Sequence, residues 1–141
     1  MKILLYSHSD YSWVWKFWHQ QTDKYLYNFK KICFLDNKVK FREDYLVFNY
    51  DDRKSYKERI ISCLDKLDDE EIVLFTHEDM FLYEKPNFQI MNEYEDLIRN
   101  DKCHVIKLVR AFENLQKSTL HKNLLINPHN QLFSIQPSLI K

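Results

Sequence analysis

Two adjacent acidic residues, Glu78 and Asp79, follow an apolar run at residues 72–75. The run reads Ile-Val-Leu-Phe and predicts a buried strand, from which Thr76 and His77 lead to the two acids. Ligands of open α/β sheets bind just beyond the carboxyl ends of the strands, where carboxylates are placed to hold a metal ion or a phosphorylated ligand. The alternative is a turn whose acids cap the next segment, because acids are common in loops. Residues 76–79 are called the acidic tip below.

Polar residues also follow two other apolar runs, at the point where each predicted strand ends. Ser7 and His8 come directly after residues 2–6, and Asp52 lies just beyond residues 46–50. The carboxyl ends of parallel strands meet at one edge of a sheet. We therefore expect these residues and the acidic tip to lie together.

A basic segment follows Asp52 along the chain. Ser55 and Glu58 form a capping-box pattern that predicts a helix start, and four basic residues lie within residues 53–59. Among them Arg59 is the favoured phosphate partner, because a guanidinium group can donate two parallel hydrogen bonds to a phosphate. The alternative is a set of surface ion pairs, since a charged helix face is usually solvated.

The elements that must position these residues are six strands and three helices, in the order β-α-β-β-α-β-α-β-loop-β. Strands are predicted at residues 2–6, 31–35, 46–50, 72–75, 104–110 and 132–135. Helices are predicted from Trp13 toward Phe29, over residues 56–67 and over residues 88–98, where Asn100 and Asp101 end the last one. Residues 111–130 read as a loop in which 124–126 could pair briefly. Charged residues interrupt 104–110, which indicates either an edge strand or a position at the rim of the sheet.

This order predicts one α/β domain over residues 1–141, a three-layer sandwich with a largely parallel, Rossmann-like sheet. Trp13, Trp15 and Trp18 are interpreted as core residues, because large aromatic rings dominate core burial. The three cysteines, Cys33, Cys63 and Cys103, are widely spaced without a C-x-x-C pair, which favours buried free thiols over a disulfide or a zinc site.

Composition excludes several classes of function. The chain contains no glycine, which removes the dinucleotide-binding loop, the P-loop and the nucleophile elbow, because each requires glycine for close backbone approach or positive φ. A charge balance of 21 basic and 21 acidic residues, interspersed along the chain, argues against nucleic acid as a partner. No apolar run has the length of a signal peptide or a membrane span, so we expect a soluble, cytoplasmic protein.

Short motifs give the chain a resemblance to a known family. The motifs are Tyr-Ser-His-Ser-Asp-Tyr at residues 6–11, Tyr-Asp-Asp at residues 50–52 with Tyr-Lys-Glu-Arg at residues 56–59, and Val-Leu-Phe-Thr-His-Glu-Asp-Met-Phe-Leu at residues 73–82. With Phe-Ser-Ile-Gln-Pro-Ser-Leu-Ile-Lys at residues 133–141, they resemble a nucleotide-diphospho-sugar glycosyltransferase of the GT-A fold. In that family an acidic Asp-x-Asp-type motif after a central strand binds a divalent cation and the diphosphate of the sugar nucleotide.

The resemblance implies a set of site residues and ligands. Asp79, with Glu78 nearby, would hold Mn²⁺ or Mg²⁺, and Ser7, His8, Asp52 and Arg59 would contact the nucleotide of a nucleoside-diphosphate sugar. The acceptor is an unknown glycan, protein or lipid, and no catalytic base is identified. The family's C-terminal acceptor-binding part is expected to be missing, so that this chain is a short member that binds donor better than it transfers sugar. A homo-oligomer or a partner chain is one way to complete such a site.

Two other functions remain open. A non-catalytic nucleotide-binding or interaction domain, derived from such an enzyme, would use the same sheet edge. A metal-dependent nucleotidyltransferase would use the same acids, although the chain lacks the glycine-rich or strongly basic phosphate loop expected after its first strand.

Overall fold

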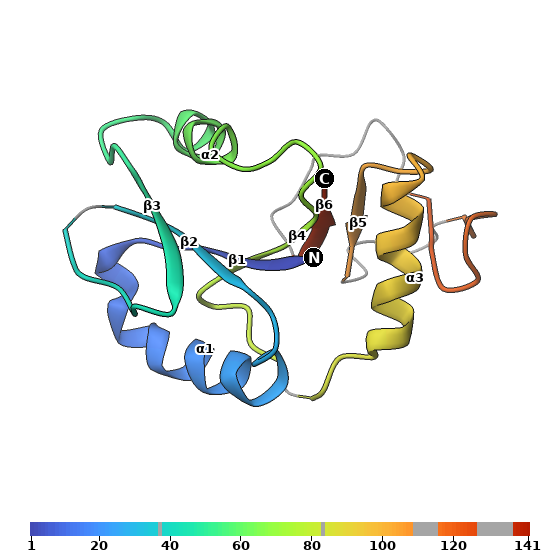
Figure 1. Cartoon of the computed structure of the whole chain (residues 1–141), viewed down its shortest axis with the longest axis horizontal. Coiled ribbons are helices and arrows are strands. Elements are labelled where there is room, and N and C mark those ends of the chain that lie inside the picture. The colour runs from blue at the N-terminus through green and yellow to red at the C-terminus, as the bar shows by residue number, and fades with distance from the viewer. Residues whose placement is uncertain (37, 83, 109–115, 127–136) are drawn as a thin grey trace.

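The computed structural model describes residues 1–36, 38–82, 84–108, 116–126 and 137–141. The elements in chain order are β1 (Lys2–Tyr6), the 3-10 helix η1 (Ser9–Tyr11), α1 (Ser12–Tyr25), β2 (Lys31–Asp36), β3 (Tyr45–Tyr50), α2 (Tyr56–Leu64), β4 (Val73–His77), α3 (Phe88–Arg99), β5 (Val105–Lys107) and β6 (Ser138–Ile140). The described strands form one six-stranded sheet in the order β3-β2-β1-β4-β6-β5 (Figure 1).

The sheet is mixed but mostly parallel. The strands β3, β2, β1 and β4 pair in parallel, whereas β6 runs antiparallel to both of its neighbours, β4 and β5. The prediction of an α/β fold with a largely parallel sheet is therefore confirmed. The short strand β5 lies at the end of the sheet, as predicted for an edge strand.

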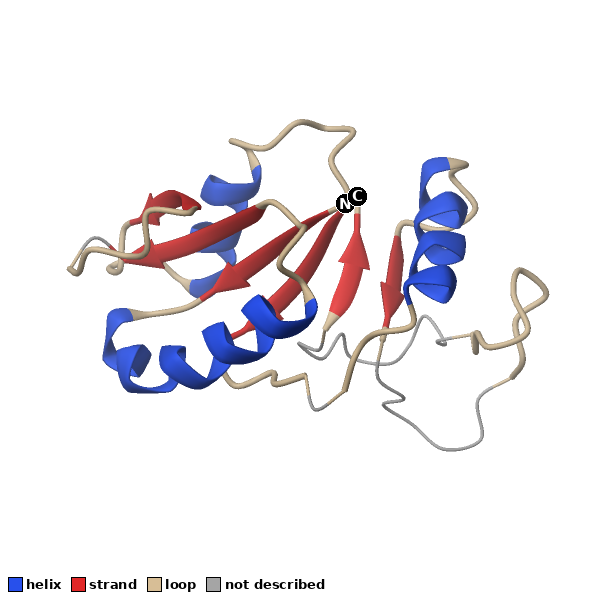
Figure 2. Ribbon diagram, turned by 60° about the horizontal axis from the view of Figure 1, so that its bottom comes forward, coloured by secondary structure: helices blue, strands red, loops and turns tan. Residues whose placement is uncertain are grey.

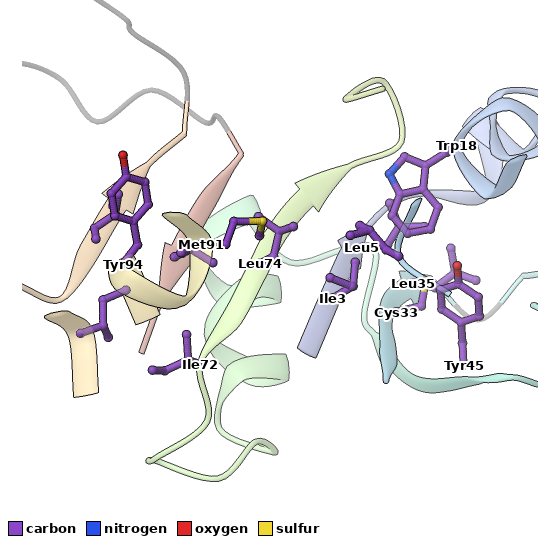
Figure 3. Close-up of a cluster of buried hydrophobic side chains, with 14 of the residues drawn as sticks. Ile3, Leu5, Trp18, Cys33, Leu35, Tyr45, Ile72, Leu74, Met91 and Tyr94 are labelled. Atoms are coloured by element: carbon purple, nitrogen blue, oxygen red, sulfur yellow. The ribbon is translucent and has the colours of Figure 1, made fainter. Parts of the chain in front are cut away.

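Hydrophobic side chains pack on both faces of the sheet. Along β1 the alternating residues Ile3 and Leu5 belong to a cluster with α1 and α3, whereas Leu4 and Tyr6 belong to a second cluster with α2. Figure 3 shows the first cluster, in which Trp18 of α1 lies near Leu5. Figures 1 and 2 show α1 and α2 on opposite sides of the central strands, so both faces of these strands are covered by a helix.

The predicted helices are confirmed, with differences at their ends. The capping box at α2 is present, because the Glu58 N–H donates to the Ser55 side chain and the Ser55 N–H donates to Glu58. The helix α1 ends at Tyr25, before the predicted Phe29, which packs against the core from a turn. The end of α3 uses Asp101 at positive φ (52°), a position that most proteins give to glycine.

Two sequence interpretations are wrong. Trp13 is 73% exposed and is not part of the core that the sequence predicts for it, whereas Trp18 is buried and Trp15 is partly buried. Trp13 lies one position before the buried line of Val14 and Trp18, which are four residues apart on one face of α1. Cys103 is only partly buried, although Cys33 and Cys63 are buried free thiols as predicted.

The sequence predicts the last strand at a different place from the strand that the structure describes. The predicted strand at residues 132–135 lies outside the described residues, and the strand observed near this point is β6, which inserts between β4 and β5. A bridge joins Lys117 to Leu125, which confirms a brief pairing near 124–126. Within the described residues, no helix has the length and apolar character needed to cross a membrane.

Candidate functional site

Apart from Arg59, which lies in α2, the predicted site residues follow strands that run in the same direction. Tyr6, Tyr50 and His77 are the last residues of β1, β3 and β4, which belong to the parallel part of the sheet. Ser7 with His8, Asp51 with Asp52, and Glu78 with Asp79 follow these three residues directly. The expected convergence at one sheet edge is therefore present, and this edge is called the carboxyl edge below.

Asp52 is the centre of a charged network at the carboxyl edge. Its carboxylate contacts His8 Nε2 at 3.0 Å, Lys38 Nζ at 2.8 Å and Arg59 Nη1 at 3.2 Å. The Lys38 ammonium and then the His8 ring lower the pKa of Asp52 to about 2, so this carboxylate is ionised at neutral pH. The Asp10 N–H donates to His8 Nδ1 at 3.1 Å, which leaves His8 Nε2–H to donate to Asp52.

Arg59 holds the segment between β3 and α2 in place. Its Nε–H donates to the Lys54 carbonyl at 2.8 Å, its Nη2–H donates to the Asp52 carbonyl at 2.6 Å, and its guanidinium lies over the Tyr50 ring at 5.4 Å. The ion pairing that the sequence left open as an alternative is thus present. The Arg59 side chain keeps 22% of its surface exposed, so contact with a phosphate stays a prediction.

Ser7 lies beneath the carboxyl edge. It is 1% exposed, its hydroxyl accepts a hydrogen bond from Trp15 Nε1 at 2.8 Å, and its carbonyl accepts one from the Tyr50 hydroxyl at 2.7 Å. These contacts fix the point at which the chain leaves β1 and turns toward His8. The Ser7 side chain therefore supports the loop that carries His8.

Glu78 and Asp79 differ sharply in environment. Glu78 is 8% exposed, and its Oε2 has no hydrogen-bond partner within the described part of the chain. Burial raises the pKa of Glu78, while hydrogen bonds from its own main chain and from Ser7 act in the opposite direction. Asp79 is exposed at the end of the acidic tip. A buried carboxylate oxygen without a donor is costly in a native protein, which makes a bound cation or donor at Glu78 favourable.

The Glu78 environment predicts an effect on stability. Because its pKa is raised above the ordinary value of 4.5 in the folded state, its contribution to stability is complete below about pH 4 and is lost as the pH rises through the folded-state pKa. We expect Glu78→Gln to be more stable than the natural protein at pH 7 and to lose this advantage near pH 4, because glutamine, like the protonated acid, carries no charge into the buried site. Urea unfolding at the two pH values measures this. The exposed Glu84→Gln is the matched control, and a loss of stability in Glu78→Gln at pH 7 would contradict the assignment.

The sequence did not single out Asp36, which organises this edge from β2. Asp36 is fully buried at the end of β2, and its carboxyl accepts hydrogen bonds from the Ser9 N–H at 2.6 Å and the Ser9 hydroxyl at 2.7 Å. The exposed Lys38, which pairs with Asp52, was also missed. One feature of the sequence could have identified Asp36: it directly follows an apolar run, as do the acids after the other strands.

Aromatic rings line the α2 side of the carboxyl edge. Tyr6 stacks on Tyr50 with ring centroids 5.3 Å apart and meets Tyr56 edge-on at 5.1 Å. Tyr56 is 39% exposed, and its hydroxyl lies 3.3 Å from His77 Nε2. Burial lowers the pKa of His77, so its ring is neutral at neutral pH. The rings therefore present an uncharged wall beside the charged network of Asp52.

Among the described residues, a cation at the acidic tip would have to be held jointly with a ligand. The described residues contain no group of three or more His, Cys, Asp or Glu side chains able to hold a metal ion by themselves. Mg²⁺ is usually bound through one or two carboxylates together with substrate phosphates. Glu78, with its unpartnered oxygen, and the adjacent exposed Asp79 supply two carboxylates of that kind.

Comparisons with protein-family models, with curated proteins and with solved structures find no match to this chain.

Proposed function

We propose that this chain binds a nucleoside-diphosphate sugar at the carboxyl edge and transfers the sugar to an acceptor. One observation carries the proposal: residues separated by up to 72 positions, from Ser7 to Asp79, follow strand ends on the same sheet edge, and His8 and Arg59 both contact Asp52. The motif resemblance to GT-A glycosyltransferases indicates the substrate class. The same proposal includes a three-layer, Rossmann-like GT-A arrangement, which is supported by helices on both faces of the sheet.

The residues of the carboxyl edge have distinct parts in donor binding. Asp52 is an ionised acceptor for ribose hydroxyls, and the exposed Lys38 and the partly buried Arg59 bring positive charge toward the diphosphate. His8 orients Asp52 through Nε2–H, and Ser7 holds the loop beneath. Glu78 and Asp79 would hold Mn²⁺ or Mg²⁺, which, when bound, neutralises negative charge on the diphosphate leaving group.

Product analysis separates this function from the two alternatives. The purified chain is incubated with Mn²⁺ and with a panel of sugar nucleotides, or with nucleoside triphosphates and sugar phosphates. We expect slow release of nucleoside diphosphate from one sugar nucleotide and no release of pyrophosphate from a triphosphate. Pyrophosphate release would favour a nucleotidyltransferase, and tight donor binding without any turnover would favour a non-catalytic binding domain.

Arg59→Lys tests the phosphate contact. Lysine keeps the charge but cannot make the bidentate contact of a guanidinium group, so we expect donor affinity to fall about 10-fold. Calorimetric titration with the nucleoside diphosphate measures this. Arg53→Lys is the matched control, because Arg53 is 89% exposed and pairs only with Asp51 among the described residues. Unchanged affinity in Arg59→Lys, with a change in stability alone, would assign Arg59 to ion pairing.

A further inference from the structure

A pocket of about 380 Å³ lies next to the acidic tip, on the face of the sheet that packs against α1. Its lining includes Ile3 of β1, Leu74 of β4 and Trp18 of α1. Met80 and Phe81, in the segment after the acidic tip, also line it. Ile3, Leu74 and Trp18 belong to the cluster with α1 and α3, whereas Tyr50 beneath Arg59 belongs to the cluster with α2. Asp79 also lines the pocket, so it joins this cavity to the carboxyl edge.

The chemistry of the pocket wall favours an apolar ligand. Two hydroxyls in the wall are already satisfied, because Thr22 donates to the Trp18 carbonyl at 2.8 Å and Thr76 donates to the Leu4 carbonyl at 3.0 Å. Within the described residues, the polar side chains of the wall that lack a hydrogen bond are Gln21 and Asp79. A free sugar buries many hydroxyls and would leave most of them unpaired here, at a cost for each.

Exposed aromatic rings extend the apolar surface away from the pocket. Phe81, which lines the pocket, is 42% exposed and lies edge-on to Phe17 with ring centroids 6.5 Å apart. Phe17 is 54% exposed, and Trp13 lies four residues before it on α1. An apolar chain longer than the pocket would therefore find further apolar surface along α1.

We propose that this pocket holds the apolar body of the acceptor, whose single hydroxyl lies beside Asp79. This inference rests on the proposed function and names the acceptor class as an alcohol on an apolar body, either an alkyl chain or an aryl ring. The volume lies within the range of pockets that bury small ligands, about 300–1,000 Å³. The donor at the carboxyl edge and the acceptor in the pocket then meet at Asp79.

The transfer step balances with these two substrates alone. The acceptor hydroxyl oxygen forms a bond to the anomeric carbon of the donor sugar. The bond between that carbon and the diphosphate oxygen breaks, and its electron pair leaves with the nucleoside diphosphate. The hydroxyl proton passes to solvent water.

Protein-observed NMR titration tests the pocket without any donor. The probes are 1-octanol, 4-butylphenol and glucose, and the indole N–H signals report where they bind, because Trp18 lines the pocket and Trp13 and Trp15 do not. We expect saturable shifts at Trp18 with at least one of the two alcohols and none with glucose. The alcohol that binds more tightly distinguishes an alkyl acceptor from an aryl acceptor. Saturable shifts with glucose, or no saturable shift with either alcohol, would overturn the inference.

Two neighbouring glutamines provide a matched pair of variants. Gln21 lines the pocket and Gln20 does not, although both lie on α1. We expect Gln21→Trp to fill the mouth of the pocket and weaken alcohol binding at least 10-fold, and Gln20→Trp to leave it unchanged. Phe81→Ala is a second test on an exposed residue, with an expected loss of about 5-fold. If Gln21→Trp or Phe81→Ala binds the alcohol as tightly as the natural protein does, the assignment of the site is overturned.

Activity then tests the acceptor role separately. The alcohol that binds should increase release of nucleoside diphosphate from the donor in the natural protein and not in Gln21→Trp. Alcohol binding without any sugar-nucleotide binding would contradict the proposed function and the acceptor role together. Sugar-nucleotide binding without alcohol binding would contradict the pocket inference alone.

Discussion

Asp36→Ala is expected to lower the free energy of unfolding by about 3–5 kcal/mol, because two buried donors lose their partner at about 1–3 kcal/mol each. The carboxyl of Asp36 is fully buried and accepts hydrogen bonds from the Ser9 N–H at 2.6 Å and the Ser9 hydroxyl at 2.7 Å. Alanine leaves both donors without a partner and opens a cavity at the end of β2. Urea unfolding followed by circular dichroism measures the change.

Smaller substitutions measure the separate contributions of the hydrogen bonds between Asp36 and Ser9. Asp36→Asn keeps the shape and one acceptor oxygen, so we expect it to cost about half as much as alanine. Ser9→Ala removes only the hydroxyl and should cost about 1–2 kcal/mol. Because Ser9 follows His8 directly, Asp36→Ala should also weaken nucleotide binding in the fraction that remains folded. A cost below about 1 kcal/mol for Asp36→Ala would show that Asp36 does not organise this loop.

Asp79→Asn is expected to abolish the dependence of nucleotide binding on a divalent cation. Asparagine keeps the size of the side chain but removes the negative charge that a hard cation requires. Asp79 is exposed and makes no hydrogen bond with the described residues, so the free energy of unfolding should change by no more than about 0.5 kcal/mol. Calorimetric titration with and without Mn²⁺ measures the effect.

The matched control for this variant is Asp69→Asn. Asp69 is an exposed acid in the segment before β4, away from the carboxyl edge. The control should keep full metal-dependent binding. Metal-dependent binding that is equally strong in Asp79→Asn would remove Asp79 from the site.

The central part of the fold follows from local patterns in the sequence. The strands β1, β2 and β4 are short apolar runs, and the capping box at Ser55 and Glu58 predicts the start of α2. Parallel pairing then places the strand ends on one edge, which is why Asp52 and the acidic tip were predicted to lie together.

Features that depend on distant contacts were not predictable in this way. The burial of Asp36 depends on Ser9, which is 27 positions away and turns back over the edge of the sheet. The strand β6 has only three residues, and its place between β4 and β5 is fixed by long-range pairing. The exposure of Trp13 follows from its position on α1, because Trp18 lies on the buried face of the helix and Trp13 lies beside that face.

Thermal unfolding with nucleoside diphosphates tests whether the chain binds such a ligand together with a divalent cation. The chain is heated with UDP, GDP, ADP, CDP or dTDP, with and without Mn²⁺. A ligand that binds only the folded state at about 100 times its dissociation constant adds about 2.7 kcal/mol of stability. For a chain of 141 residues this corresponds to a rise in Tm of roughly 8–10 °C. We predict such a rise with at least one diphosphate, only when Mn²⁺ is present, and no rise in Asp79→Asn. The same Tm with every diphosphate and Mn²⁺ as with Mn²⁺ alone would contradict the account.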